Sequence, residues 1–200
     1  DAPLDLVKSC YRVAGAARLP APWALGPWIW RDDNRDQQEV LDDVAKMREL
    51  DLATSGIWID NPYATAVSSF DFDPAKFTDA PGMIAKVRAA GMRVALWSAP
   101  YLEVATGSLR AQATSSGFFP PAPGISLNKW SSPIDFTNPS AFAFWRDLAK
   151  RYADVGVEGF KLDYGEDVVP SLGLVRSPGG CADGTDERVM HEYKEGELRT

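Results

Sequence analysis

The 200-residue sequence is poor in the side chains that build most metal centres and nucleophilic triads. It has one histidine, His191, and two cysteines, Cys10 and Cys181. Two distant thiols without a CxxC or Cys/His spacing do not form a recognisable zinc site, so we interpret both as reduced cysteines without a functional role. A Ser-His-Asp triad or a histidine-rich metal centre would have to be built around His191 alone. We therefore expect neither.

Long apolar runs and an excess of positive charge are also missing. No apolar stretch approaches the roughly 20 residues that cross a bilayer. The 21 Lys and Arg residues are outnumbered by 28 Asp and Glu residues, which gives a formal net charge of −7. A surface of this sign repels phosphate backbones and anionic lipids, so we expect neither nucleic acid nor a membrane as a partner. The N-terminus carries no signal pattern, and the compartment stays open.

Aromatic residues, in contrast, are plentiful, with seven tryptophans in the chain. Most surplus tryptophan belongs to a core. Aromatic faces also bind the apolar side of a sugar ring, so the positions of these residues bear on function.

Four segments share one layout, in which a short apolar run precedes a loop and then a helical pattern. The helix from Pro139 should point five side chains inward: Phe142, Trp145, Leu148, Tyr152 and Val155. The Pro-, Gly- and Ser-rich segment 100–132 is too long for an ordinary turn and is expected to be a functional excursion. Strands are expected at 23–30, 57–60, 93–97 and 157–163, and helices at 37–50, 81–90, 139–155 and 187–199, the last after a loop at 170–184.

Alternating strands and helices imply an α/β protein with a parallel sheet. No glycine-rich phosphate loop follows the first strand, which argues against a dinucleotide-binding fold. Polar or aromatic residues stand at the C-terminal end of the strands, and this favours a (β/α)8 TIM barrel. Such a barrel needs eight units, so we expect this chain to supply about the first four. Residues 1–20 would lead in from a preceding N-terminal domain, and residues 21–200 would form the first half of the catalytic domain.

The stretch GFKLDYGED, residues 159–167, contains the strongest chemical signal. Lys161 and Asp163 are two apart on a strand and point to the same side. A cation beside a carboxylate lowers its pKa below the usual value of about 3.9 and keeps it ionised for attack. Glu166 follows on the loop, close enough to support the site. The alternative interpretation is a structural ion pair at a strand end.

Two other strands end in residues of complementary chemistry. Asp60 ends the second strand and Trp97 ends the third, so a barrel places both beside Asp163. A glycosidase subsite needs a carboxylate that accepts hydrogen bonds from sugar hydroxyl groups, an aromatic wall and an ionised nucleophile. Alternatively, Asp60 is a turn residue before Asn61-Pro62, and Trp97 is simple barrel packing.

Four ordered segments carry a resemblance to glycoside hydrolase family 31, whose members include α-glucosidases and α-xylosidases. The segments are PWALGPW (22–28), the stretch 70–101, PIDFTNPSAFAFW (133–145) and GFKLDYGEDVVP (159–170). The last is similar to the family's Lys-x-Asp-Phe-Gly-Glu nucleophile motif. The resemblance therefore implies a TIM-barrel enzyme in which Asp163 is the nucleophile.

The same resemblance implies further roles. Asp60 would bind hydroxyls of the sugar in subsite −1, Trp97 would form part of its wall, and Lys161 would contact this sugar or the nucleophile. Trp130 would line the approach. The acid/base carboxylate of the family comes from a later strand and is expected beyond Thr200, so the remainder of the same polypeptide would be needed to complete the barrel.

The implied reaction is hydrolysis of a terminal α-linked sugar with retention, through a covalent glycosyl-Asp intermediate and without a metal or organic cofactor. After Asp60 the chain reads Asn-Pro-Tyr, where α-glucosidases carry Ile-Asp-Tyr-Met, and its GEDVVP continuation is more similar to the α-xylosidase branch. We therefore leave a glucoside and a xyloside open as substrates.

Three alternatives to a hydrolase remain at this point. In the first, the chain belongs to a sugar-binding homologue without the acid/base; in the second, it belongs to a transglycosylase or lyase that uses the same nucleophile. In the third, Asp60, Asp163 and Glu166 would hold Mg²⁺, an arrangement that a neighbouring Lys161 disfavours.

Overall fold

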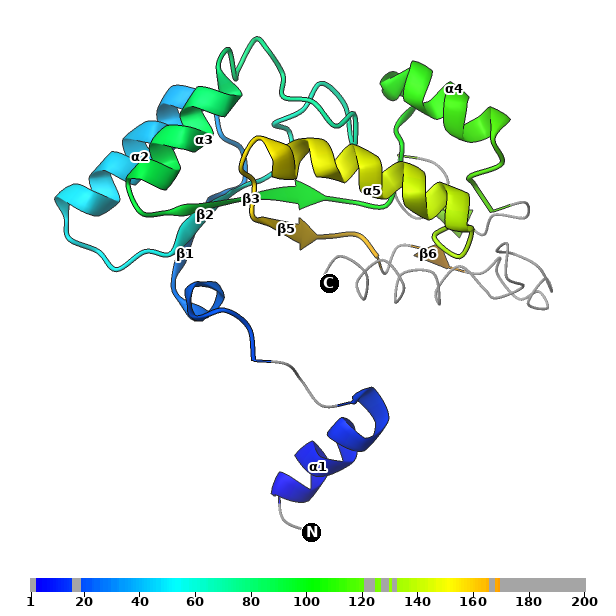
Figure 1. Cartoon of the computed structure of the whole chain (residues 1–200), viewed down its shortest axis with the longest axis horizontal. Helices are drawn as coiled ribbons and strands as arrows, with labels where there is room; N and C mark the ends of the chain where they lie inside the picture. The colour runs from blue at the N-terminus through cyan, green and yellow to red at the C-terminus, as the bar shows by residue number, and fades with distance from the viewer. Residues whose placement is uncertain are drawn as a thin grey trace.

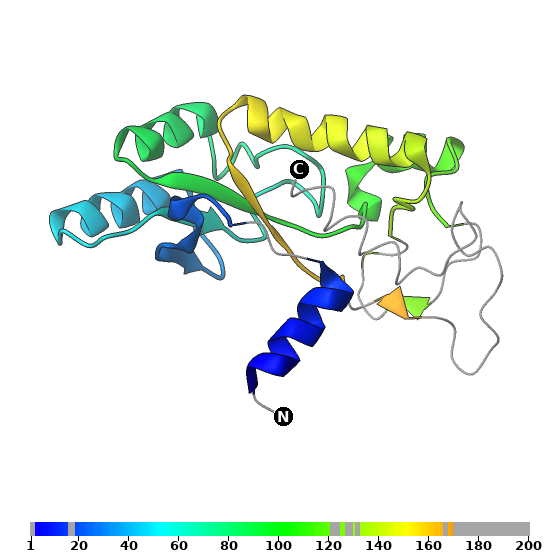
Figure 2. The ribbon, with the colours of Figure 1, turned by 60° about the horizontal axis from the view of Figure 1, so that its bottom comes forward.

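The apolar runs form one parallel sheet in the computed structural model, which describes residues 3–15, 19–120, 125–126, 130, 133–165 and 168–169. Its strands lie in the order β1 (Trp28–Arg31), β2 (Gly56–Ile59), β3 (Arg93–Ser98) and β5 (Gly159–Leu162). Helices cover one face of this sheet (Figures 1 and 2). Glu166, the loop at 170–184 and the helix expected at 187–199 lie outside the described residues.

Alternation along the strands divides their side chains between the two faces of the sheet. Ile57, Leu96 and Phe160 pack in the core beneath the helices. The neighbours of these residues in sequence point to the opposite face, because successive strand residues alternate. The parallel register pairs Trp30 with Trp58 and Trp97 with Lys161, so the face away from the helices carries tryptophans and a lysine.

Three predicted helices are confirmed within a residue or two of their expected bounds. They are α2 (Gln37–Glu49), α3 (Ala80–Ala89) and α5 (Pro139–Asp154), and each follows an Asp or Asn whose side chain accepts a hydrogen bond from the first turn. Such caps satisfy amide groups that have no partner inside the helix. The caps therefore explain why the helices begin where they do.

Helix α5 departs from the prediction at its end. Trp145, Leu148 and Tyr152 are buried as expected, and Phe142 is partly buried. The inward placement of Val155 is wrong, because this residue follows the last helical residue and is 36% exposed. Gly156 follows with a φ of 104°, which is not helical, so the row of inward-facing side chains does not continue past the helix.

Two other predictions need correction. The first strand was expected from Trp23, but Pro22–Leu25 form a 3-10 helix (η1), and β1 begins only at Trp28. Proline fixes φ at a value that suits the first turn of a helix, which favours this start. The excursion also contains unexpected helices, η2 (Val104–Thr106) and α4 (Ser108–Ser115), and α4 buries only Ala113.

Two elements lie outside the main sheet. The short strands β4 (Ile125–Ser126) and β6 (Val168–Val169) pair with each other in antiparallel fashion. Helix α1 (Pro3–Ala14) stands apart from the sheet (Figure 1), with Leu6 and Val13 exposed. Within the described ranges, no helix is long and apolar enough to cross a membrane.

Candidate functional site

Four of the predicted site residues meet where the parallel strands end. Asp60 directly follows β2, Trp97 and Lys161 are paired in register on β3 and β5, and Asp163 directly follows β5. Parallel strands bring their carboxyl ends to one edge of a sheet, and this explains how residues about 100 positions apart come together. Their polar atoms are linked by direct contacts between 2.8 and 3.1 Å.

Asp163 is held by three donors. Its Oδ2 accepts from the Trp97 indole Nε1 at 2.8 Å and lies 3.1 Å from Lys161 Nζ. Its Oδ1 accepts from the backbone N–H of Tyr164 at 3.1 Å. Partial burial opposes ionisation, but the Trp97 hydrogen bond, the Lys161 ammonium and this N–H together hold the pKa of Asp163 below its ordinary value. The carboxylate is therefore ionised at neutral pH.

Lys161 connects the two carboxylates of the site. Its Nζ lies 3.0 Å from Asp60 Oδ2 and 3.1 Å from Asp163 Oδ2. Partial burial lowers the pKa of this ammonium, but the hydrogen bonds and charges of the two carboxylates raise it above its ordinary value overall. The ammonium occupies the position between Asp60 and Asp163 at which the magnesium alternative would place its ion.

Asp60 is buried and accepts more bonds than the sequence predicted. Its Oδ2 accepts from Trp30 Nε1 at 2.8 Å and from Trp58 Nε1 at 3.2 Å, in addition to Lys161. Its Oδ1 accepts from the backbone of Asn61 at 2.9 Å. Burial of a carboxylate is tolerated when hydrogen bonds and a cation compensate for lost water, as they do here.

Trp30 and Trp58 were therefore missed as site residues. Their rings pack at a centroid distance of 5.8 Å, and Trp30 is 47% exposed. Trp30 stands near the end of β1, so the rule that selected Asp60 and Trp97 at strand ends also points to Trp30. Trp58 lies on the same face as Trp30 because the two are paired in the register of β1 and β2.

An aromatic cluster forms the wall beside Asp163. Trp130 packs against Trp97 and, at 4.7 Å between ring centroids, against Tyr164. Trp130 is only 6% exposed, so it supports the wall from behind more than it faces solvent. Tyr101 completes the cluster at 5.9 Å from Trp130. The excursion after β3 thus returns one tryptophan to the site.

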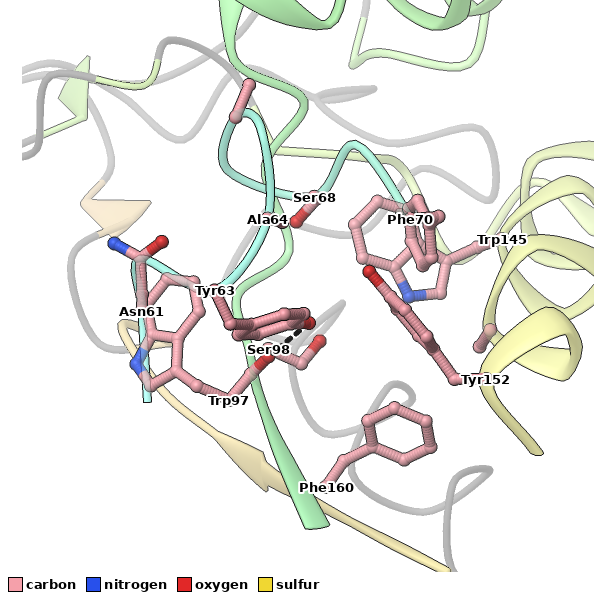
Figure 3. Close-up of a pocket in the computed structure, with 12 residues that line it drawn as sticks. Asn61, Tyr63, Ala64, Ser68, Phe70, Trp97, Ser98, Trp145, Tyr152 and Phe160 are labelled. Atoms are coloured by element: carbon pink, nitrogen blue, oxygen red, sulfur yellow. Dashed lines mark hydrogen bonds between the residues drawn. The ribbon is translucent and has the colours of Figure 1, made fainter. Parts of the chain in front are cut away.

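A cavity on the helix side of the sheet is too small for a sugar. It lies between the segment 61–70, β3, β5 and α5, and half of its lining residues are aromatic (Figure 3). Its free volume of about 10 Å³ holds roughly one water molecule. Tyr63 donates to the Trp97 carbonyl across it at 3.1 Å and so supports the strand end from behind. This cavity is therefore separate from the cluster of Asp60, Lys161 and Asp163 on the other face of the sheet.

Known proteins resemble this chain over most of its length. Residues 17–194 match the glycosyl hydrolases family 31 TIM-barrel domain. The chain is 26% identical to an α-xylosidase of Lactiplantibacillus pentosus over 82% of its length, and 24% identical to the lysosomal α-glucosidase of Rattus norvegicus over 90%. It spans 23% and 20% of these relatives, which is about a quarter or less of each.

A solved structure shows the same architecture. The chain superposes on a family 31 dextranase of Flavobacterium johnsoniae with a TM-score of 0.81 and 18% identity, covering 96% of this chain and 25% of the dextranase. The four parallel strands are thus part of a TIM barrel, and the predicted fold class is confirmed. With a family model matched across nearly the whole chain, this protein belongs to glycosyl hydrolase family 31.

Proposed function

We propose that this chain carries the nucleophile side of the active site of a retaining α-glycosidase. One observation supports this proposal above all others: an ionised carboxylate, Asp163, is fixed by Lys161 and Trp97 at the end of a barrel strand. An ionised carboxylate at this face of the barrel is the group that a retaining glycosidase uses for attack.

The reaction has two steps. Asp163 attacks the anomeric carbon, and the bond to the departing oxygen breaks as a second carboxyl group, about 5–5.5 Å away, protonates that oxygen. Water, deprotonated by the same second group, then releases the sugar from Asp163. The second carboxyl group comes from the part of the polypeptide outside residues 1–200, and residues 21–200 form the first half of the catalytic domain, with residues 1–20 leading into it. Glu166, three residues after Asp163 in the sequence, is proposed to support the site.

The substrate is a terminal α-linked glucoside or xyloside. Asp60 and Lys161 contact its hydroxyls in subsite −1, and Trp97 forms the wall, with Trp130 behind it. Support comes from the α-xylosidase and α-glucosidase among the relatives and from the joint position of these side chains. Trp30 adds a second, more exposed aromatic surface beside Asp60.

The decisive experiment removes the charge of Asp163 in the full-length protein. Asp163→Asn is expected to lower turnover of aryl α-glucosides and α-xylosides by several orders of magnitude, because an amide is a poor nucleophile. Asp147→Asn is the control, since Asp147 is exposed on α5 and bonds only its neighbour Arg146 in the contacts described. Equal thermal unfolding of both variants would show that folding is intact.

A trapping experiment identifies the nucleophile directly. Full-length protein would be incubated with mechanism-based α-glucosyl and α-xylosyl fluorides, and peptides would be sequenced by mass spectrometry. We expect one sugar to become attached to Asp163 and the better substrate to label faster. Near-normal turnover by Asp163→Asn, or a label on another carboxylate, would refute the assignment.

A further inference from the structure

The residue that follows the proposed nucleophile has an unusual backbone conformation. Tyr164 has a φ of 58°, in the left-handed region. A β-carbon crowds the backbone there, so a bulky residue keeps this conformation only when its surroundings hold it. Residues of this kind cluster at functional sites, and Tyr164 lies directly beside Asp163.

Contacts from two sides hold Tyr164 in place. The hydroxyl of Tyr101 donates to the Tyr164 carbonyl at 3.0 Å. The ring of Trp130 packs edge-on against the Tyr164 ring, at 4.7 Å and an interplanar angle of 84°. Tyr101 itself is fully buried just after β3, so its hydroxyl is a fixed donor.

The backbone of Tyr164 also contacts the nucleophile. Its N–H donates to Asp163 Oδ1 at 3.1 Å, so contacts that hold the Tyr164 backbone also hold this donor. Because Trp97 and Lys161 hold the other oxygen, this third donor sets the rotation of the carboxylate plane. A group that attacks a carbon centre depends on such orientation, since small displacements slow reactions strongly.

We propose that Tyr101 is a positioning residue for the nucleophile, because its hydroxyl anchors the backbone of Tyr164 and so keeps the Tyr164 N–H on Asp163 Oδ1. The inference rests on the proposed function, because orientation of Asp163 affects catalysis only if Asp163 attacks the sugar. Tyr101 is assigned this role through its contact with Tyr164. It acts through the backbone of Tyr164.

Tyr101→Phe in the full-length protein tests this role, because it removes one hydroxyl and keeps the packed ring. The matched control is Tyr152→Phe, which removes a buried hydroxyl that donates to the Asp71 carbonyl at 2.8 Å on the helix side of the sheet. Relative to the control, Tyr101→Phe should lower the rate of Asp163 labelling by an α-glycosyl fluoride about 10-fold or more.

Two further readouts separate positioning from loss of stability. The apparent Km of Tyr101→Phe for an aryl α-glycoside should change little while kcat falls, and the acid limb of kcat/Km should move to higher pH as the N–H contact to the carboxylate weakens. A rate and pH profile equal to those of Tyr152→Phe would overturn the inference and leave the proposed function standing.

A crystal structure of the full-length Tyr101→Phe variant provides a test that does not depend on activity. We expect the Tyr164 N–H to move out of hydrogen-bond distance of Asp163 Oδ1. If wild-type protein is never labelled at Asp163, the proposed function fails, and the crystal structure still decides whether Tyr101 holds Tyr164. Retention of the contact in the variant would overturn the inference.

Discussion

At the scale of single residues, the charge of Lys161 governs the proposed nucleophile. Lys161→Met keeps the length of the side chain and removes the ammonium that lies 3.1 Å from Asp163. The pKa of Asp163 should then rise, because a cation that stabilises the ionised form is lost. In pH–rate profiles of the full-length protein, the acid limb of kcat/Km should move to higher pH. Lys150→Met, on the exposed side of α5, should leave this limb unchanged.

The same shifts predict how acid and base affect stability. Asp163 has a lowered pKa in the folded protein, so its contribution is complete above about pH 3.9, its unfolded value, and is lost as pH falls through the lower folded pKa. Lys161 has a raised pKa, so its contribution is complete below about pH 10.4 and is lost as pH rises through the higher folded pKa. Unfolding of wild type and Lys161→Met, compared across pH, should differ least at the two extremes.

Site residues at short sequence spacing or at strand ends were predictable, whereas the contacts that depend on strand register were not. Lys161 and Asp163 are two apart on one strand, and alternation alone places them together. Trp30 and Trp58 donate to Asp60 only because β1 and β2 are paired at that level, and the sequence does not state this register. The Tyr101–Tyr164 contact depends in the same way on the order of β3 and β5.

At the scale of elements, the cap of α5 has a measurable effect. Asn138 Oδ1 accepts from the backbone of Ser140 at 2.9 Å and of Ala141 at 3.4 Å. Asn138→Ala should destabilise the first turn by about 1 kcal/mol. Faster amide exchange at the start of α5, followed by mass spectrometry, would show the loss. Ser140→Ala keeps both backbone donors and should exchange at the wild-type rate.

Hydrophobic periodicity predicted whether a segment is a helix or a strand. The ends of these elements depend on local features such as capping side chains and proline. The helices with an Asp or Asn cap and an inward stripe were located within two residues. Helix α4 was not predicted, because its sequence has almost no periodic apolar stripe. In the structure it buries only Ala113. The start of β1 was misplaced because tryptophans suit both a strand and the 3-10 turn that Pro22 opens.

At the scale of the whole molecule, sheet edges and apolar side chains limit what residues 1–200 can do alone. Within the described part of the chain, β1 and β5 each pair with a single strand of the main sheet. Leu4, Leu6 and Val13 are 69%, 73% and 91% exposed. Open edges and apolar surface promote association. Expressed alone, this chain should be poorly soluble and inactive. Static light scattering would measure association of the 200-residue chain, and a glycoside assay would measure its activity. An active 200-residue monomer would contradict the half-barrel assignment.

The ammonium shared by Asp60 and Asp163 has a consequence for the energy of the proposed reaction. Two anions and one cation leave this trio with one surplus negative charge, which a neutral sugar does not balance. The transition state of glycosyl transfer is oxocarbenium-like and carries positive charge, so trio and sugar become electroneutral together at that point. The three side chains and the sugar are also neutral together in the intermediate, because Asp163 is then a neutral ester. The charge of these three side chains is therefore balanced by the sugar first in the transition state, and an enzyme accelerates a reaction by being complementary to the transition state.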